Sequence, residues 1–320
     1  MRLSGITPSG HPQLGNYLGA IRSWAEDGGP DDLYFIADLH AMTTTHNPGK
    51  LRALSSEMLA VLVACGIPPE RVFVQSDLAR ELGALTWVLE CTCSYGEAAR
   101  MIQFKEKAGG QAGVRLSLLT YPVLMAADIL LQGASEVPVG EDQSQHVELA
   151  RALARRFNAT YGEVFTVPEA VLPLTGARVR DLAEPVRKMS KSTRDSAGVV
   201  FVLDEPDLVR RKIRRAVTDG HSAPAYSPED RPGVSNLLEI LSACTGVPPA
   251  DAAAEHRSYG ALKEAVADAV VEALRPIRAR TLELLTDQAE LDRIRKEGAT
   301  RAAERGEHRL QSALRLIGAG

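Results

Sequence analysis

Two short segments carry residue types that suit phosphate chemistry. The first, residues 4–19, is rich in glycine, so its backbone can approach a phosphate closely. A helix is predicted to begin near Gly15 and Asn16, and its free N–H groups and positive dipole end would point at that phosphate. The segment matches neither the G-x-G-x-x-G dinucleotide pattern nor the G-K-[ST] of a P-loop. By itself it indicates a phosphate loop or a strand-exit loop without a ligand.

The second segment is the string Lys188-Met189-Ser190-Lys191-Ser192. Two lysines three residues apart, interleaved with serines, suit a triphosphate, because charge develops on the transferred and leaving groups. Charge alone would also fit a solvated loop. The five-residue string is specific evidence for a phosphate site only when the first segment is also present. The two segments together predict chemistry on a nucleoside triphosphate.

A third feature is a carboxylate in an apolar stretch. Tyr121, Met125 and Asp128 stand at i, i+4 and i+7, so a helix places them on one face. A carboxylate in such surroundings is costly unless a partner satisfies it. The sequence leaves two partners open: a buried arginine, which would be structural, or a donor on a bound substrate.

The first half of the chain predicts the elements that position these residues. Short apolar runs alternate with helix-length segments, which favours a parallel sheet with ligands at the carboxyl ends of its strands. Asn47 and Pro48 supply an N-cap and a first helical residue, and Gly66 ends that helix. Residues 116–131 are apolar all round and predict a buried helix. The strand candidates are residues 3–6, 33–37, 72–75 and 137–140.

The second half predicts helices only. The expected architecture is α/β: a Rossmann-like parallel-sheet nucleotide-binding domain over residues 1–184, then an all-helical domain over residues 185–320 that includes the lysine string. The last helix is expected to pack back on the first domain. The helix candidates are residues 208–217, 235–244, 259–274, 277–285 and 287–316.

Composition narrows the class of protein. With 320 residues, 45% hydrophobic content and a formal net charge of −4, the chain can bury a core, which excludes a disordered protein. Its opening is broken too early by Pro8 and Gly10 for a signal peptide, and polar residues interrupt residues 116–131, which argues against a membrane span. The four cysteines show no C-x2-C spacing, so a reduced cytoplasmic setting is expected and a zinc site is not.

The chain also resembles class I aminoacyl-tRNA synthetases, and within them the bacterial tryptophanyl-tRNA synthetase family, nearly from end to end. A variant of the family's "HIGH" signature falls on residues 13–16, and residues 188–192 carry its lysine loop. The related tyrosyl family shares the fold and the lysine loop but looks different around Asp128 and residues 140–143. Further matching segments are residues 37–43, 101–107, 119–130, 137–143, 176–178 and 216–219.

The resemblance implies a reaction in which ATP and tryptophan give tryptophanyl-adenylate and pyrophosphate, and the acyl group then passes to the 3′ end of tRNA(Trp). Magnesium would arrive on ATP, without a metal site in the protein. The implied catalytic residues are Lys188, Lys191, Ser192 and Lys107. The implied ATP-binding residues are Thr7, Pro8, Ser9, Gly15, Asn16, Gly140, Glu141, Asp142, Val179, Lys188, Met189, Ser190, Lys191 and Ser192.

For the amino acid, the resemblance makes Asp128 the acceptor of the indole N–H, a donor that phenylalanine lacks. A site built on such a bond can reject analogues by roughly 10⁴-fold, so no editing domain is needed. The implied tryptophan-binding residues are Asp128, Met125, Tyr121, His40, Gly5 and Gln143. A lone histidine such as His40 is otherwise more often structural. A tyrosine-specific synthetase, a small nucleotidyltransferase and a non-catalytic tRNA-binding or regulatory paralogue remain as alternatives.

A basic segment and two positions that differ from the family's usual residues lead to further predictions. Residues 187–215 contain nine Lys or Arg against four Asp or Glu, which predicts a tRNA patch or a solvated helix face. By resemblance, residues 96–131 form a homodimer interface and the helical domain recognises the anticodon. Thr7 stands where the family usually has glutamine, and Gln13 where it has histidine or threonine. These departures raise the hypothesis of an auxiliary copy that tolerates a tryptophan-mimicking inhibitor.

Overall fold

A computed structural model describes residues 1–319 except residues 103, 105–113, 172–177 and 191–195. A parallel sheet lies at the centre of the first half. Strands β1 (Leu3–Ile6), β2 (Leu33–Ile36) and β3 (Val72–Val74) pair in that order. Strand β4 (Glu136–Pro138) pairs with β5 (Glu169–Val171), and a parallel bridge between Arg2 and Glu136 sets β4 beside β1.

This strand order creates a switch point between β1 and β4. From β1 the chain proceeds to β2 on one side, and it returns to β4 on the other side. Loops that leave the carboxyl ends of such neighbouring strands diverge, and ligands of open parallel sheets bind in the crevice between them. The predicted Rossmann-like class and the four strand positions are confirmed, although β5 was not predicted.

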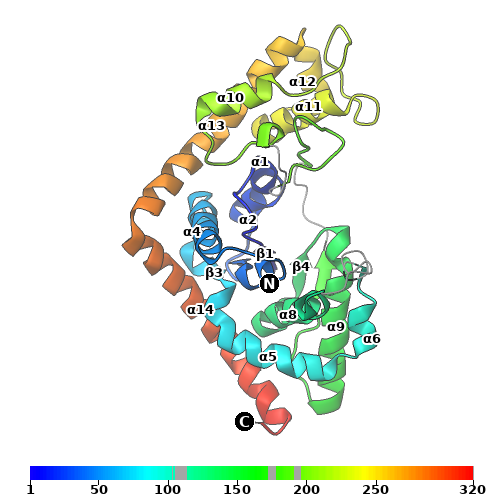
Figure 1. The fold of residues 1–320 in the computed structure, drawn as a ribbon, viewed down its shortest axis with the longest axis vertical. Coiled ribbons are helices and arrows are strands. Elements are labelled where there is room, and N and C mark those ends of the chain that lie inside the picture. Colours follow the sequence, from blue (N-terminus) through cyan, green and yellow to red (C-terminus); the bar gives the residue numbers. More distant parts are fainter. Residues whose placement is uncertain (103, 105–113, 172–177, 191–195, 320) are drawn as a thin grey trace.

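Helices cover both faces of the sheet (Figure 1). Tyr34 and Ile36 belong to the core that α4 shares with the helical second half, whereas Leu33 and Phe35 belong to the core formed with α5, α8 and α9. Strands buried on both faces explain why their sequences are continuous apolar runs. The helices of this half are α1 (Leu14–Asn16), α2 (Arg22–Glu26), α3 (Asp38–Ala41), α4 (Pro48–Ala64), α5 (Ala79–Thr92), α6 (Tyr95–Ala99), α8 (Leu116–Gln132) and α9 (Glu141–Tyr161), with a π-helical turn at Tyr17–Ile21.

Local signals explain the ends of α4. The Asn47 side chain accepts a hydrogen bond from the Lys50 N–H at 2.9 Å, and Pro48 is the first helical residue. Gly66 follows the helix with φ at +97°, a conformation that favours glycine. In α8, by contrast, the prediction of all-round burial is wrong, because Leu116 is 73% exposed and only the second half of the helix lies in the core.

The second half is helical, as predicted. Helices α10 (Pro206–Arg214), α11 (Pro232–Thr245) and α12 (Pro249–Glu255) gather at one end of the molecule with the start of α13 (Tyr259–Thr286) (Figure 1). Helix α13 passes α4, and α14 (Gln288–Leu316) packs against β3 and α8. The sequence predicted a break before Ile277, but α13 continues through Pro276. That proline lies on the exposed face, where water can bond the carbonyl that it leaves free.

None of the described helices is both long and apolar enough to span a membrane.

Candidate active site

The carboxyl ends of three parallel strands, β1, β2 and β4, bring several of the predicted residues to one edge of the sheet. Gly5 lies in β1, and Thr7, Pro8 and Ser9 follow that strand directly. His40 lies in α3, which follows β2, and Gly140 caps α9 just after β4. At Gly5 a side chain is excluded, because a Cβ would stand 2.6 Å from the Phe35 ring.

Asp128 is a buried carboxylate at this edge, with 2% of its surface exposed. Its Oδ2 lies 2.9 Å from His40 Nε2, and Gln75 Nε2 donates to both carboxylate oxygens at 2.9 and 2.8 Å. Among the residues that the structure describes, the hydrogen-bond partners of Asp128 are therefore His40 and Gln75, and the buried arginine that the sequence left open is not one of them. Burial raises the pKa of Asp128, and the hydrogen bonds from His40 and Gln75 oppose that rise.

Gln75 is the residue of this network that sequence reasoning missed. It follows β3, is fully buried, and its Oε1 accepts from the backbone N–H groups of Leu39 and His40 at 3.1 and 3.3 Å. One amide thus ties α3 to Asp128 on α8. The available signal was a polar residue directly after the apolar run 72–74, at the strand end where ligands are expected.

A second chain of contacts reaches from α8 to α9. The rings of His40 and Tyr121 meet edge to face with centroids 6.2 Å apart. Tyr121 Oη lies 3.1 Å from His146 Nε2, and His146 Nδ1 lies 2.8 Å from Gln143 Oε1. Because an amide oxygen only accepts, His146 donates to Gln143 and the tyrosine hydroxyl donates to His146. His146 was not predicted, although it stands one helical turn from Gln143.

The structure therefore brings the expected tryptophan-binding side chains together. His40 contacts both Tyr121 and Asp128, and Gln143 is linked to Tyr121 through His146. Met125 lies between Tyr121 and Asp128 on α8 and packs against the core.

The two phosphate segments also meet. Gln13 Nε2 donates to the Met189 carbonyl at 2.9 Å, and a Cβ on Gly15 would lie 3.3 Å from Val179 Cβ. Asn16 Oδ1 accepts from the Gln13 backbone N–H at 3.2 Å. The glycine-rich loop, Val179 and the start of the lysine string thus pack against one another.

Of the four predicted catalytic residues, one lies in the described part of the chain. Lys188 is exposed on the loop, whereas Lys191, Ser192 and Lys107 lie outside the described residues. Glu141 and Asp142 occupy the first turn of α9, and their side chains are likewise outside the description.

The basic segment needs one correction. Lys212 is buried, and its Nζ donates to the Val199 carbonyl at 2.7 Å and to Asp204 Oδ2 at 2.6 Å. It is therefore a structural residue and is not part of a surface for tRNA. Arg210 pairs with Asp268, whereas Arg211, Arg214 and Arg215 are exposed on α10 and the turn after it.

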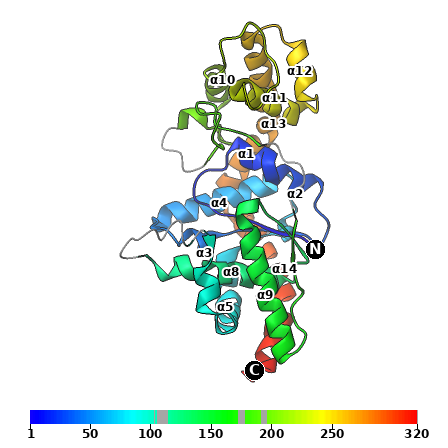
Figure 2. The same cartoon turned by 90° about the vertical axis from the view of Figure 1, so that its right-hand side faces the viewer.

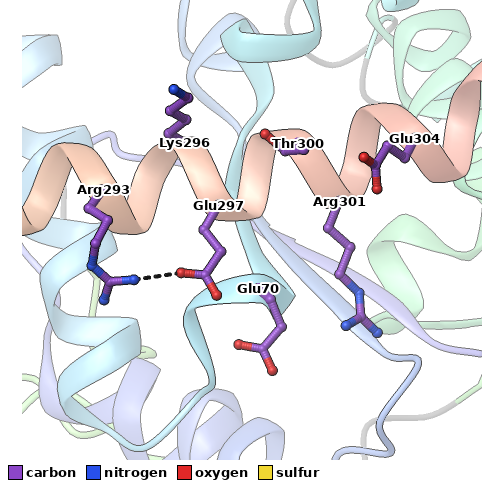
Figure 3. A pocket seen from close by; sticks show the side chains of 7 residues that line it. All are labelled: Glu70, Arg293, Lys296, Glu297, Thr300, Arg301 and Glu304. Atoms are coloured by element: carbon purple, nitrogen blue, oxygen red, sulfur yellow. Dashed lines mark hydrogen bonds and ion pairs between the residues drawn. The ribbon is translucent and has the colours of Figure 1, made fainter.

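A hollow of about 620 Å³ lies along α14, away from this edge (Figure 3). Glu70 in the turn before β3 lines it, so it opens where the strand begins, opposite to the candidate site. Its walls carry charges of both signs, and Arg293 pairs with Glu297 at 2.7 Å. Within the described part of the chain, no group of three His, Cys, Asp or Glu side chains is placed to hold a metal ion.

Comparisons with known proteins agree with this geometry. The profile of a family described as "tRNA synthetases class I (W and Y)" matches residues 2–275. The chain is 52% identical to Tryptophan--tRNA ligase 1 of Streptomyces coelicolor, over 98% of this chain and 96% of that protein. It is 49% identical to Tryptophan--tRNA ligase 1 of Streptomyces avermitilis, over 98% and 97%.

Solved structures agree as well. The tryptophanyl-tRNA synthetase of Mycoplasma pneumoniae matches with a TM-score of 0.87 and 33% identity, over 100% of this chain and 97% of that one. The Campylobacter jejuni synthetase, solved with ADP and tryptophan, matches with a TM-score of 0.85 and 31% identity, over 99% and 100%. The paired loops, the buried carboxylate and these relatives lead to one conclusion: the chain belongs to the class I tRNA synthetase family for tryptophan and tyrosine.

Proposed function

We propose that this chain is a tryptophan–tRNA ligase. It activates L-tryptophan with ATP to tryptophanyl-adenylate and pyrophosphate, and it then transfers the acyl group to the 3′ end of tRNA(Trp). The observation that carries the choice of amino acid is the buried Asp128 carboxylate, held by His40 and Gln75 on the face of α8 that also presents Tyr121.

In the amino-acid site, Asp128 accepts the indole N–H. Gln75 and His40 fix the direction of its oxygens, and a carboxylate has lone pairs for a further donor. Tyr121, Met125, His40, Gly5 and Gln143 surround the ring and the amino acid's polar end. Tyrosine carries its donor on a hydroxyl at a different position, so the same acceptor does not serve a tyrosine-specific enzyme.

In the ATP site, the tryptophan carboxylate attacks the α-phosphorus and the bond to pyrophosphate breaks. The glycine-rich loop and the first turns of α1 and α9 approach the nucleotide, with Val179 against the base. Lys188 and Lys191 neutralise the departing pyrophosphate, and Ser192 and Lys107 assist them. Magnesium enters bound to the phosphate oxygens of ATP, which it prefers as ligands.

We further propose the two-domain division at residues 184 and 185 and a cytoplasmic location. The exposed arginines of α10 suit a tRNA backbone, and the helical end of the molecule is the candidate for anticodon recognition. Location follows from the substrates, because ATP and tRNA are cytoplasmic molecules in bacteria, the source of the relatives.

We also propose a homodimer through α5, α6 and α8, which extends the predicted region 96–131. Trp87 on α5 is 67% exposed, and Tyr95 on α6, Ile102 and Leu116 on α8 are exposed as well. A hollow of about 330 Å³ that Trp87 helps to line opens between α3, α5 and α8. Figure 2 shows these three helices close to one another. Large apolar side chains gathered on one face are typical of an interface.

Light scattering coupled to size exclusion tests the dimer. Trp87→Asp with Leu116→Asp should convert the chain to a monomer, because each would bury an unpaired charge in the interface. Leu282→Asp changes a half-exposed leucine on α13 and should leave the mass unchanged. A monomeric parent chain would refute the assembly.

One assay tests the function: ATP–pyrophosphate exchange measured with tryptophan, with tyrosine and without amino acid. Exchange with tryptophan alone is expected. Tyrosine-dependent exchange would identify the tyrosine-specific alternative, and tRNA binding without exchange would identify a non-catalytic paralogue.

A further inference from the structure

The buried side chain of Gln13 makes two hydrogen bonds, one to a neighbouring residue and one to a residue far along the chain. Its Oε1 accepts from the Gly15 N–H, which caps α1 locally. Its Nε2 donates at 2.9 Å to the carbonyl of Met189, a residue 176 positions further along the chain. Gln13 is 2% exposed, so water cannot replace either bond readily.

Met189 receives its position from both of its backbone groups. Its N–H donates to the Val179 carbonyl at 3.2 Å, and its carbonyl accepts from Gln13. Its side chain is 1% exposed. Lys188 precedes Met189 directly, so whatever fixes Met189 also fixes the backbone from which the Lys188 ammonium extends.

Two other hydrogen bonds of the glycine-rich loop in this region join backbone groups only, so they do not depend on side-chain identity. The Leu14 N–H donates to the Val200 carbonyl at 2.8 Å, and the Val202 N–H donates to the Pro12 carbonyl at 2.9 Å. Any residue at positions 12–14 that keeps the backbone path would preserve these two bonds. The bond to Met189, in contrast, requires a side-chain donor of glutamine's length at position 13.

We propose that Gln13 is a positioning residue for the first step of the reaction. Its amide sets Lys188-Met189-Ser190 against the glycine-rich loop, so that the Lys188 ammonium meets the pyrophosphate as it departs. This inference rests on the proposed function. It confines the effect of Gln13 to adenylate formation, because the transfer step releases AMP and involves no pyrophosphate.

The test variant is Gln13→Glu. Glutamate keeps the side-chain length and an acceptor for the Gly15 N–H, but it turns an oxygen toward the Met189 carbonyl. The kcat of tryptophan-dependent pyrophosphate exchange should fall roughly tenfold or more, the loss expected for one buried hydrogen bond. The KM for tryptophan should change by less than about twofold, as should single-turnover transfer to tRNA from isolated enzyme-bound adenylate.

Gln132→Glu is the matched control. Gln132 is equally buried, and its Nε2 donates to the Ala302 carbonyl at 3.1 Å, where α8 meets α14. The chemical change is the same, but the carbonyl lies outside the active site. This variant should lower the unfolding temperature and leave kcat within about twofold of the parent.

A double-mutant cycle with Lys188→Ala identifies the route of the effect. If Gln13 acts through Lys188, the double variant should be little slower than the slower single variant. Gln13→Met, which removes the amide without adding a charge, gives the same comparison should Gln13→Glu fail to fold.

Three results would overturn the positioning role: an unchanged kcat in both Gln13 variants, equal slowing of activation and transfer, or fully additive effects with Lys188→Ala. Absence of tryptophan-dependent exchange in the parent chain would instead overturn the proposed function, so the two failures are distinguishable.

Discussion

Asp128 is a single residue whose burial costs stability, and that cost needs an explanation. A carboxylate that is almost fully buried loses its hydration, and the raised pKa records that loss. Hydrogen bonds from His40 and Gln75 offset part of the lost hydration energy. A neutral side chain of the same shape could also form hydrogen bonds with these two residues. The charge is therefore best explained by a bond to a substrate donor.

Asp128→Asn separates the two effects. Because the folded-state pKa lies above the usual value, the ionised carboxyl lowers stability at neutral pH, and this cost declines as the pH falls toward the usual value. The variant should therefore unfold at the same or a higher temperature than the parent. The KM for tryptophan should rise roughly 10- to 100-fold, because a charge-assisted hydrogen bond is worth about 1.5–3 kcal/mol.

Calorimetry and pyrophosphate exchange measure both quantities. Asp32→Asn is the control: Asp32 is also buried, but it bonds the backbone N–H groups of Arg2 and Gly29 at the opposite edge of the sheet. It should lower stability without changing the KM. An unchanged KM in Asp128→Asn would remove Asp128 from the tryptophan site.

At the scale of elements, α6 has five residues and is too short to be stable alone. Ser94 and Glu97 form a capping box at its start. Arg156 on α9 donates to both Glu97 oxygens at 3.0 and 2.6 Å and to the Thr92 carbonyl at 2.7 Å. Glu97 thus joins the end of α5, α6 and α9 beside the proposed dimer face.

These bonds lower the pKa of Glu97 to about 2 from its usual 4.5. A carboxyl with a lowered folded-state pKa contributes its full stability above the usual value and loses it as the pH falls from 4.5 to 2. Glu97→Gln should destabilise the protein by about 1 kcal/mol at pH 7. In thermal melts, the difference from the parent should shrink as the pH falls below 4.5 and should vanish only below about pH 2, where the folded-state carboxyl is protonated as well. A difference that is independent of pH would contradict the ion pair with Arg156.

At the scale of the whole molecule, a chain with a net charge of −4 exposes three arginines on α10 and the turn after it, Arg211, Arg214 and Arg215. Arg211→Ala, Arg214→Ala and Arg215→Ala combined should weaken tRNA binding and lower the slope of log affinity against log salt by about two, because each lost phosphate contact removes about 0.7–0.9. Pyrophosphate exchange should not change, since these residues lie outside the active site. Fluorescence anisotropy at several salt concentrations measures the slope.

Lys212→Met is the companion variant on the same helix. It should leave the salt slope unchanged and cost about 3 kcal/mol of folding stability, because Asp204 would keep a buried charge without its partner. An unchanged slope in the triple arginine variant would mean that tRNA binds elsewhere.

The C-terminal helix α14 bonds to the sheet domain through arginine side chains. Arg295 on α14 bonds both oxygens of Asp77 after β3, and Arg305 and Arg309 donate to the Gln132 and Leu131 carbonyls at the end of α8. Arginine side chains near a helix C-terminus satisfy its last carbonyls. Helices α13 and α14 follow each other directly and run from the helical end of the molecule to the sheet (Figure 1).

The sequence by itself determined the features that neighbouring residues specify. The strand positions, the cap of α4 at Asn47 and the helical second half follow from local periodicity and turn chemistry. The spacing of Tyr121 and Asp128 predicts that both lie on one face of a helix, because 3.6 residues make a helical turn.

Only the tertiary structure decided which polar side chains meet. Gln75 lies 53 residues from Asp128, and Gln13 lies 176 from Met189, so no local pattern could pair them. The same holds for Lys212. The sequence predicts an exposed charge there, but in the fold the side chain is buried and bonds to the Val199 carbonyl and to Asp204. Side-chain hydrogen bonds between distant segments depend on how the elements pack, and packing is a property of the whole chain.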